Sequence, residues 1–144
     1  MILKVKKLNP EAKIPSYAHK GDAGLDIFSC EDAVLYPGER KLVSTGIATE
    51  LEEGYVALIW DKSGIAAKGI KTMGGVIDCH YRGEYKVVML NTTSENYEIK
   101  KGQKIAQLLI QPVMSVEVVE TKELSDTERG EGSFGSTGLY TNKK

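Results

Sequence analysis

An aspartate beside a turn is the first candidate for chemistry in this sequence. The segment GGVIDCHYRGEYKVV, residues 74–88, reads as a hairpin with apolar arms, and Asp78 ends its first arm. A carboxylate in this place can orient a water molecule for in-line attack, or it can simply stabilise a tight turn. Tyr81 can pack on a sugar face, or it can be ordinary hairpin surface. Neither turn formation nor ordinary hairpin surface explains why these polar residues occur together in one segment.

The glycine-rich C-terminal segment is the second candidate. It nearly spells the phosphate-loop pattern G-x-x-x-x-G-K-[ST] with Gly130, Gly135, Ser136 and Thr137. We reject a Walker-type loop, because serine stands at the lysine position and no helix follows. Glycine N–H groups can still converge on phosphate oxygens, Arg129 offers a bidentate fork, and Phe134 offers a flat face for a base. Composition alone favours a disordered tail over residues 125–144, with closure over a nucleotide as the rival interpretation.

Three shorter stretches give weaker signals. DKSG, residues 61–64, places a cation, a hydroxyl and a glycine before a predicted helix N-terminus, which can attract an anion or be a plain N-capped turn. Asp26 lies between two apolar residues in AGLDIFS, residues 23–29, and needs a partner or a function unless it faces solvent. Gln107 lies in the apolar stretch KIAQLLIQPV, where it can be a satisfied core or edge group.

The elements that must position these residues are predicted to be short strands. Segments rich in β-branched residues and bounded by Gly, Pro or Asn occupy residues 2–8, 34–51, 54–60, 74–78, 85–91, 97–113 and 116–120. Such density favours a sandwich or jelly roll over alternating βαβ units. Only SGIAAKGI, residues 63–70, is typical of a helix, with Ser63 as a possible N-cap and at most two turns.

Composition limits the classes of partner. The chain has 144 residues, 27% of them charged, and a net charge of −1, which argues for one domain and against a nonspecific binder of nucleic acid or membrane surfaces. No apolar run approaches the roughly 20 residues that span a bilayer, and the N-terminus does not resemble a secretory signal. Cys30 and Cys79 read as reduced thiols of a cytoplasmic protein, and their spacing with His19 and His80 does not favour zinc.

Taken in order, these stretches resemble the five motifs of the trimeric dUTPase family. They are DAGLDIFS (22–29), DKSGIAAKG (61–69), GGVIDCHYRGEYKVVMLN (74–91), KGQKIAQLL (101–109) and RGEGSFGSTG (129–138). The resemblance runs from about residue 4 to residue 138. It implies an all-β, jelly-roll-like sandwich or barrel with one short helix in residues 1–128, and a tail of residues 129–144 that closes over the active site. It also implies a homotrimer whose three active sites are shared between chains.

The resemblance further implies hydrolysis of dUTP to dUMP and pyrophosphate with Mg²⁺, which limits uracil in DNA and supplies dUMP for thymidylate synthesis. Asp78 would aim a water at the α-phosphate and contact the 3′-hydroxyl, and Gln107 would help to hold that water. Tyr81 would pack on deoxyribose and exclude a 2′-hydroxyl. The main chain near Gly75 and Lys86 would recognise uracil.

The remaining implied roles concern the triphosphate and the metal. Phosphate contacts would come from Lys62, Ser63, Gly64, Gln107, Arg129, Gly135, Ser136 and Thr137. Phe134 would cover uracil. Asp26 would act through waters on a Mg²⁺ ion that the triphosphate itself mainly holds.

Two departures from the family pattern leave alternatives open. The second motif usually begins Pro-Arg-Ser-Gly, whereas this chain has Asp61 and Lys62 in the first two places, and the third motif has His80 where a second acid is common. The presence of Asp61 and Lys62 lends some support to a non-catalytic trimeric nucleotide-binding module. A dCTP deaminase, which shares the fold, would need a glutamate in the outgoing strand, and residues 87–91 contain no carboxylate.

Overall fold

The computed structural model describes residues 1–133, and its fold is almost entirely β, as predicted. One short helix, α1, spans Ser63–Ala66. The strands are β1 (Lys4–Lys7), β2 (Leu25–Phe28), β3 (Ala33–Leu35), β4 (Arg40–Ser44), β5 (Ile47–Glu50), β6 (Tyr55–Asp61), β7 (Ile70–Thr72), β8 (Val76–Ile77), β9 (Lys86–Asn91), β10 (Tyr97–Ile99) and β11 (Lys104–Pro112).

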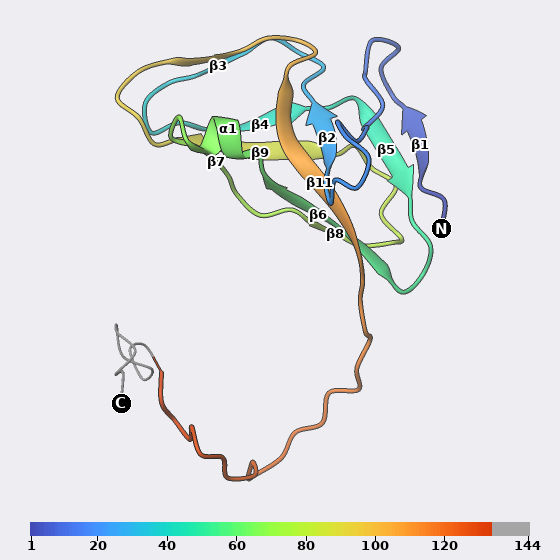
Figure 1. Ribbon diagram of the computed structural model, residues 1–144, viewed down its shortest axis with the longest axis vertical. Helices are drawn as coiled ribbons and strands as arrows, with labels where there is room; N and C mark the ends of the chain where they lie inside the picture. Colours follow the sequence, from blue (N-terminus) through green and yellow to red (C-terminus); the bar gives the residue numbers. More distant parts are fainter. Residues whose placement is uncertain (134–144) are drawn as a thin grey trace.

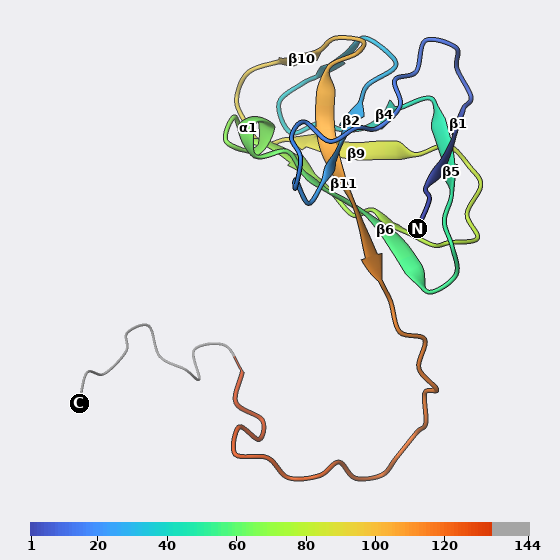
Figure 2. The ribbon, with the colours of Figure 1, turned by 45° about the vertical axis from the view of Figure 1, so that its right-hand side comes forward.

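Every strand pair is antiparallel, and the strands form two larger and two smaller sheets (Figures 1 and 2). The four-stranded sheet has the order β2-β11-β6-β8, and the three-stranded sheet has the order β4-β9-β7. Strands β1 and β5 form one small sheet, and β3 and β10 form the other. This jelly-roll-like arrangement confirms the predicted fold class.

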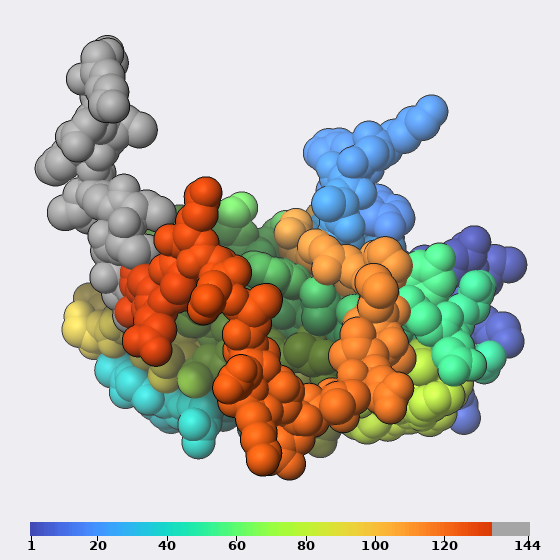
Figure 3. Space-filling model, turned by 90° about the horizontal axis from the view of Figure 1, so that it is seen from below, coloured from blue at the N-terminus to red at the C-terminus, as the bar shows by residue number. Residues whose placement is uncertain are grey.

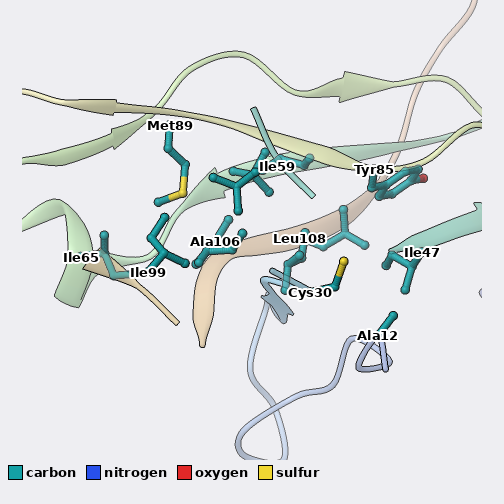
Figure 4. Close-up of a cluster of buried hydrophobic side chains, with 14 of the residues drawn as sticks. Ala12, Cys30, Ile47, Ile59, Ile65, Tyr85, Met89, Ile99, Ala106 and Leu108 are labelled. Atoms are coloured by element: carbon teal, nitrogen blue, oxygen red, sulfur yellow. The ribbon is translucent and has the colours of Figure 1, made fainter. Parts of the chain in front are cut away.

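The core lies between the two larger sheets. Strand β9 alternates, burying Val87, Met89 and Asn91 while Lys86 is exposed, which is the period of a half-buried strand. Figure 4 shows Met89 of β9 in the same apolar cluster as Ala106 and Leu108 of β11. The two sheets are therefore held together by side chains that alternate along the strands.

The predicted short helix is present, but its bounds differ from the prediction, and one predicted strand is not paired in the described chain. The helix expected over residues 63–70 ends at Ala66, and its N-cap is Lys62 rather than Ser63. It is short because Ile70, already buried, begins strand β7 on the opposite sheet. The strand expected over residues 116–120 is not formed, because residues 113–133 pair with no strand in the described chain.

Residues 113–133 instead form an exposed tail that leaves the body of the protein after β11 (Figures 1 and 2). In the view from below, the tail passes in front of the sheets (Figure 3). Its apolar side chains are uncovered, with Met114 at 86% and Val118 at 89% exposure. In residues 1–133, no helix has the length and apolarity needed to cross a bilayer.

Candidate active site

A pocket lies where the predicted hairpin opens. Strand β8 pairs with β6, with Ile77 opposite Ala57, whereas β9 pairs with β4 and β7. The two arms therefore belong to different sheets and are not partners, so the hairpin prediction is wrong. The arms separate because β8 extends the edge of one sheet while the buried side chains of β9 pack into the core. The space between them is a pocket of about 480 Å³.

The pocket collects the residues that the third motif singled out. Gly75, Asp78, Tyr81 and Lys86 all line it. Its volume falls in the range of small-molecule sites, and a nucleoside fits such a volume. Asp78 is exposed at its edge, free to contact a ligand or a water.

Tyr81 has a defined position in this pocket. Its ring stacks on the buried Tyr85, with centroids 6.3 Å apart, and its hydroxyl donates to the Glu84 carbonyl at 3.2 Å. The ring folds over Gly83, where a Cβ atom would overlap the Tyr81 hydroxyl. Burial raises the pKa of Tyr85, which shares a hydrogen bond of 2.5 Å with the Thr49 hydroxyl. A flat aromatic wall is thus fixed on one side of the pocket.

Two features of the backbone require glycine at position 75. Its φ of 123° is a conformation that other residues rarely adopt, and a Cβ atom there would lie 2.6 Å from the Ile59 Cβ. Its carbonyl accepts a hydrogen bond of 2.8 Å from the Ile59 N–H. The backbone at the pocket wall is therefore packed directly against β6.

Glu84 also lines the pocket, although no pattern in the sequence singled it out. Its carboxylate accepts hydrogen bonds from the Gly46 N–H at 2.9 Å and from the Ser44 hydroxyl. These bonds attach the loop that carries Tyr81 to the connection between β4 and β5. The Glu84 carboxylate therefore has a structural role, because its hydrogen bonds hold the loop in place.

A second cluster surrounds Asp26 on β2. Lys62, at the start of α1, donates to Oδ1 at 2.8 Å, and Lys104 of β11 forms an ion pair with Oδ2 at 2.6 Å. Asp26 is only 2% exposed. Burial acts to raise the pKa of this carboxyl, but the two ammonium groups outweigh burial and hold the pKa below its usual value. The cluster carries a net positive charge and is suited to an anion.

Lys104 had no predicted role, although it lies within the fourth motif. A lysine at the start of a strand is usually expected to extend into solvent. Only the register of β11 against β2 brings Lys104 to Asp26. The buried carboxylate was the available signal, because a charge inside an apolar strand needs a partner.

Gln107 belongs to the second cluster and not to the pocket. It lies opposite Asp26 on β2, and its side chain packs against Gly24, where a Cβ atom would be 3.1 Å from the Gln107 Cβ. Ser63 and Gly64, both exposed, begin α1 directly after Lys62. The phosphate-binding candidates of the first, second and fourth motifs therefore lie together.

One chain does not bring Asp78 and Gln107 together. Gln107 is in register with Trp60, whereas Ile77, the residue before Asp78, is in register with Ala57. Three residues along a strand span about 10 Å and two strand spacings span roughly 10 Å at right angles to it, so the two backbones are on the order of 14 Å apart. A single phosphorus cannot be next to both side chains of the same chain.

The described part of the fifth motif, residues 129–133, lies in the exposed tail. Arg129 is exposed in the tail, and its Nε donates to the Gly132 carbonyl at 3.0 Å. Phe134, Gly135, Ser136 and Thr137 lie outside the described residues. The chain thus presents a pocket, an anion-binding cluster and a tail as three separate parts.

Residues 1–133 contain no group of three acidic, histidine or cysteine side chains that could form a metal cage. The one carboxylate of the second cluster is Asp26, whose Oδ1 is paired with Lys62 and whose Oδ2 is paired with Lys104. A magnesium ion held by substrate phosphates needs acceptors for its bound waters rather than a protein cage. The residues present fit that arrangement.

Comparison with known proteins gives a consistent result. A family model described as dUTPase matches residues 10–138. Two curated relatives are each named deoxyuridine 5'-triphosphate nucleotidohydrolase. The protein of Nautilia profundicola is 54% identical over 96% of this chain and 99% of its own length. That of Clostridioides difficile is 48% identical over 95% of this chain and 98% of its own length.

Solved structures agree with the family models. A mutant dUTPase of Staphylococcus bacteriophage 80alpha with dUpNHpp superposes with a TM-score of 0.90 at 35% identity, covering 96% of this chain and 99% of that chain. A mutant dUTPase from phage phi11 of S. aureus, described with a structural Mg(II) ion, has a TM-score of 0.82 at 30% identity, covering 88% of this chain and 100% of that chain.

Proposed function

Because the chain belongs to the dUTPase family and is a dUTP nucleotidohydrolase, we propose that its active site joins the Asp78 pocket of one subunit to the Asp26 cluster of another. The observation that carries this proposal is the separation of Asp78 from Gln107 within one chain. Each chain then supplies both halves, but to different sites.

The hydrolytic step is an in-line attack by water on the α-phosphate of dUTP. Asp78 orients the water and accepts its proton as the phosphorus–oxygen bond forms, while pyrophosphate leaves on the opposite side. Gln107 of a neighbouring subunit holds the same water from its amide. Positioning, more than covalent chemistry, lowers the barrier in phosphoryl transfer of this kind.

The nucleoside lies in the pocket between β8 and β9. Uracil meets the main chain near Gly75 and Lys86, whose peptide groups have fixed directions and distinguish an oxygen from an amino group. Tyr81 packs on the deoxyribose, where its stack on Tyr85 leaves it no freedom to make room for a 2′-hydroxyl.

The triphosphate lies on the Asp26 cluster. Lys62 supplies positive charge, and Ser63 and Gly64 supply the N–H groups and hydroxyl at the start of α1. Arg129 and the Gly135–Thr137 segment of the tail close over the phosphates, and Phe134 covers uracil. Bound Mg²⁺ would neutralise phosphate charge, and Asp26 is the carboxylate of the cluster that would act on the metal through its waters.

The subunits form a homotrimer in this proposal. Apolar side chains are uncovered on the four-stranded sheet, where Trp60 is 56% and Val76 is 74% exposed, and along the tail, where Val118 is 89% exposed. Exposed apolar surface of this extent is typical of a protein–protein interface. We place the enzyme in the cytoplasm, where the free thiols of Cys30 and Cys79 would stay reduced. There it removes dUTP before it reaches DNA and supplies dUMP.

The test follows pyrophosphate and ammonia from purified protein given dUTP or dCTP with Mg²⁺. Pyrophosphate from dUTP alone is expected. Ammonia from dCTP would instead indicate a deaminase, and saturable binding without turnover a binding module. Among residues 1–133, Glu84 is the one glutamate that lines the pocket, and its bonds to Gly46 and Ser44 make it unsuited to proton transfer on a base.

Mixing two inactive variants tests the shared site. Asp78→Asn and Gln107→Ala should each abolish turnover, with Asp78→Asn still binding dUTP. Refolded together in equal amounts, they should regain roughly a quarter of the wild-type sites, because random assembly then pairs an intact Asp78 with an intact Gln107 from another chain. No recovery in mixed trimers would show that both residues act within one chain.

A further inference from the structure

Asp61 departs from the usual second motif, and the structure shows where its charge goes. Its Oδ2 forms an ion pair with Lys71 Nζ, and its Oδ1 accepts a hydrogen bond of 2.6 Å from the Thr72 N–H. Burial acts to raise the pKa of Asp61, but the bonds from Lys71 and Thr72 outweigh it and lower the pKa overall. The side chain therefore remains a carboxylate, directed at β7.

The Thr72 N–H has no strand partner of its own. Strand β7 pairs with β9 on one side only, so it is an edge of the three-stranded sheet. Unpaired N–H groups on an edge must be covered or solvated, and Thr72 is buried at 7% exposure. Asp61, the last residue of β6, supplies the acceptor that this edge lacks.

The next residue is anchored in a different direction. Lys62 reaches Asp26 on β2, in the four-stranded sheet, whereas Asp61 reaches β7 in the three-stranded sheet. Two consecutive side chains thus attach the start of α1 to both sheets. The segment they hold, Lys62–Gly64, is the part of the proposed site that meets the triphosphate.

We propose that Asp61 is a positioning residue, which fastens the Lys62–Gly64 turn to β7, and that Lys71 neutralises it so that the triphosphate is not repelled. This inference rests on the proposed function of the turn. A proline, usual at this place in the family, stiffens a backbone without accepting a hydrogen bond. Here an ion pair and a hydrogen bond hold the turn instead.

The test is a double-mutant cycle of Asp61 and Lys71, measured with dUTP and with deoxyuridine. Lys71→Met keeps the Asp61–Thr72 bond but leaves a carboxylate without its ion pair beside the phosphate turn, so KM for dUTP should rise about tenfold. Asp61→Asn removes the charge and keeps one acceptor oxygen, so the rise should be about threefold. The double variant should resemble Asp61→Asn and be better than Lys71→Met, which additive effects would not give.

Deoxyuridine, which has no phosphate, is the probe for the pocket alone. Its inhibition constant should stay within twofold in all three variants, because Asp61 lies outside the Asp78 pocket. Lys68→Met is the matched control, since Lys68 is exposed beside α1 and forms no ion pair with any residue from 1 to 133. That variant should keep the wild-type KM for dUTP.

Three results would overturn the inference. The first is an unchanged KM for dUTP in both Lys71→Met and Asp61→Asn. The second is an equal loss of deoxyuridine and dUTP affinity, which would show a general structural effect. The third is a double variant worse than Lys71→Met. If Asp61→Asn does not fold, Lys71→Met alone decides, because it keeps the Thr72 bond. A wild-type protein without turnover would refute the proposed function instead, a separate result.

Discussion

Replacing Asp26 by asparagine should destabilise the protein by an amount that its surroundings define. The substitution keeps the side-chain volume but leaves Lys62 and Lys104 facing each other without their shared carboxylate. Removing one partner of a fully buried pair costs about 3–5 kcal/mol. Here the two lysine side chains are 28% and 44% exposed and can turn towards water. The expected loss is therefore about 1–3 kcal/mol at pH 7.

The loss should depend on pH in a defined direction. The folded-state pKa of Asp26 is below its ordinary value of 3.8, so its contribution is fully present above that value. The contribution disappears as the pH falls through the folded-state pKa, where the carboxylate takes up a proton. The stability gap between wild type and Asp26→Asn should be constant from pH 6 to 8 and close below about pH 4.

Urea unfolding at fixed protein concentration measures the gap, because the stability of an oligomer depends on concentration. Glu50→Gln is the control, since the Lys4–Glu50 pair is 68% and 49% exposed and such surface pairs contribute about 0–1 kcal/mol. A gap no larger than that of Glu50→Gln, or one equally large at pH 3, would refute the electrostatic account of the cluster.

Three further predictions concern the pocket, the turn and the tail. Gly75→Ala should lower the free energy of unfolding by about 1–3 kcal/mol and weaken deoxyuridine binding, because its Cβ would overlap Ile59. Gly74→Ala, where φ is also positive at 72° but the Cβ would meet open space, should lose about 1 kcal/mol. Lys62→Arg should lower KM for dUTP about threefold through a bidentate contact, and an unchanged KM would show that lysine already suffices. Deleting residues 129–144 should leave a folded trimer by size-exclusion chromatography with severely reduced turnover, whereas full activity would exclude a lid.

Four residues of the third motif line the same pocket because they are close together in the chain. Gly75, Asp78, Tyr81 and Lys86 span twelve positions, and any fold of that segment keeps them near one another. The alternating strands and their turns were also local signals. These gave the fold class without any knowledge of how the sheets pair.

The hairpin prediction failed because strand pairing is not a local property. Residues 74–88 have two apolar arms and a glycine between them, which is the usual hairpin signal. Whether the arms pair with each other depends on competing partners, and here β6 takes one arm while β4 and β7 take the other. This competition separates the two arms and forms the pocket between them. The hairpin prediction therefore failed at the place where the candidate active site lies.

The two lysine contacts were also beyond local reasoning. Lys104 is 78 positions from Asp26, and Lys71 meets Asp61 only because α1 turns the chain back along β6. A charged residue at a strand end has the same appearance in sequence whether it faces water or a buried carboxylate. Register alone distinguishes these cases, and register follows from the whole sheet.

The strand expected at residues 116–120 shows what β-propensity alone cannot predict. Val116, Val118 and Val119 give the segment a strong β-propensity, yet they are 71%, 89% and 72% exposed and have no strand partner in the described chain. A strand needs a neighbour to receive its hydrogen bonds, and propensity does not say which chain provides it. Under the proposed trimer, the tail finds its neighbour on another subunit, as Asp78 finds Gln107. The unpaired strand and the divided site then have one cause, because a single chain is not the complete folding and catalytic unit.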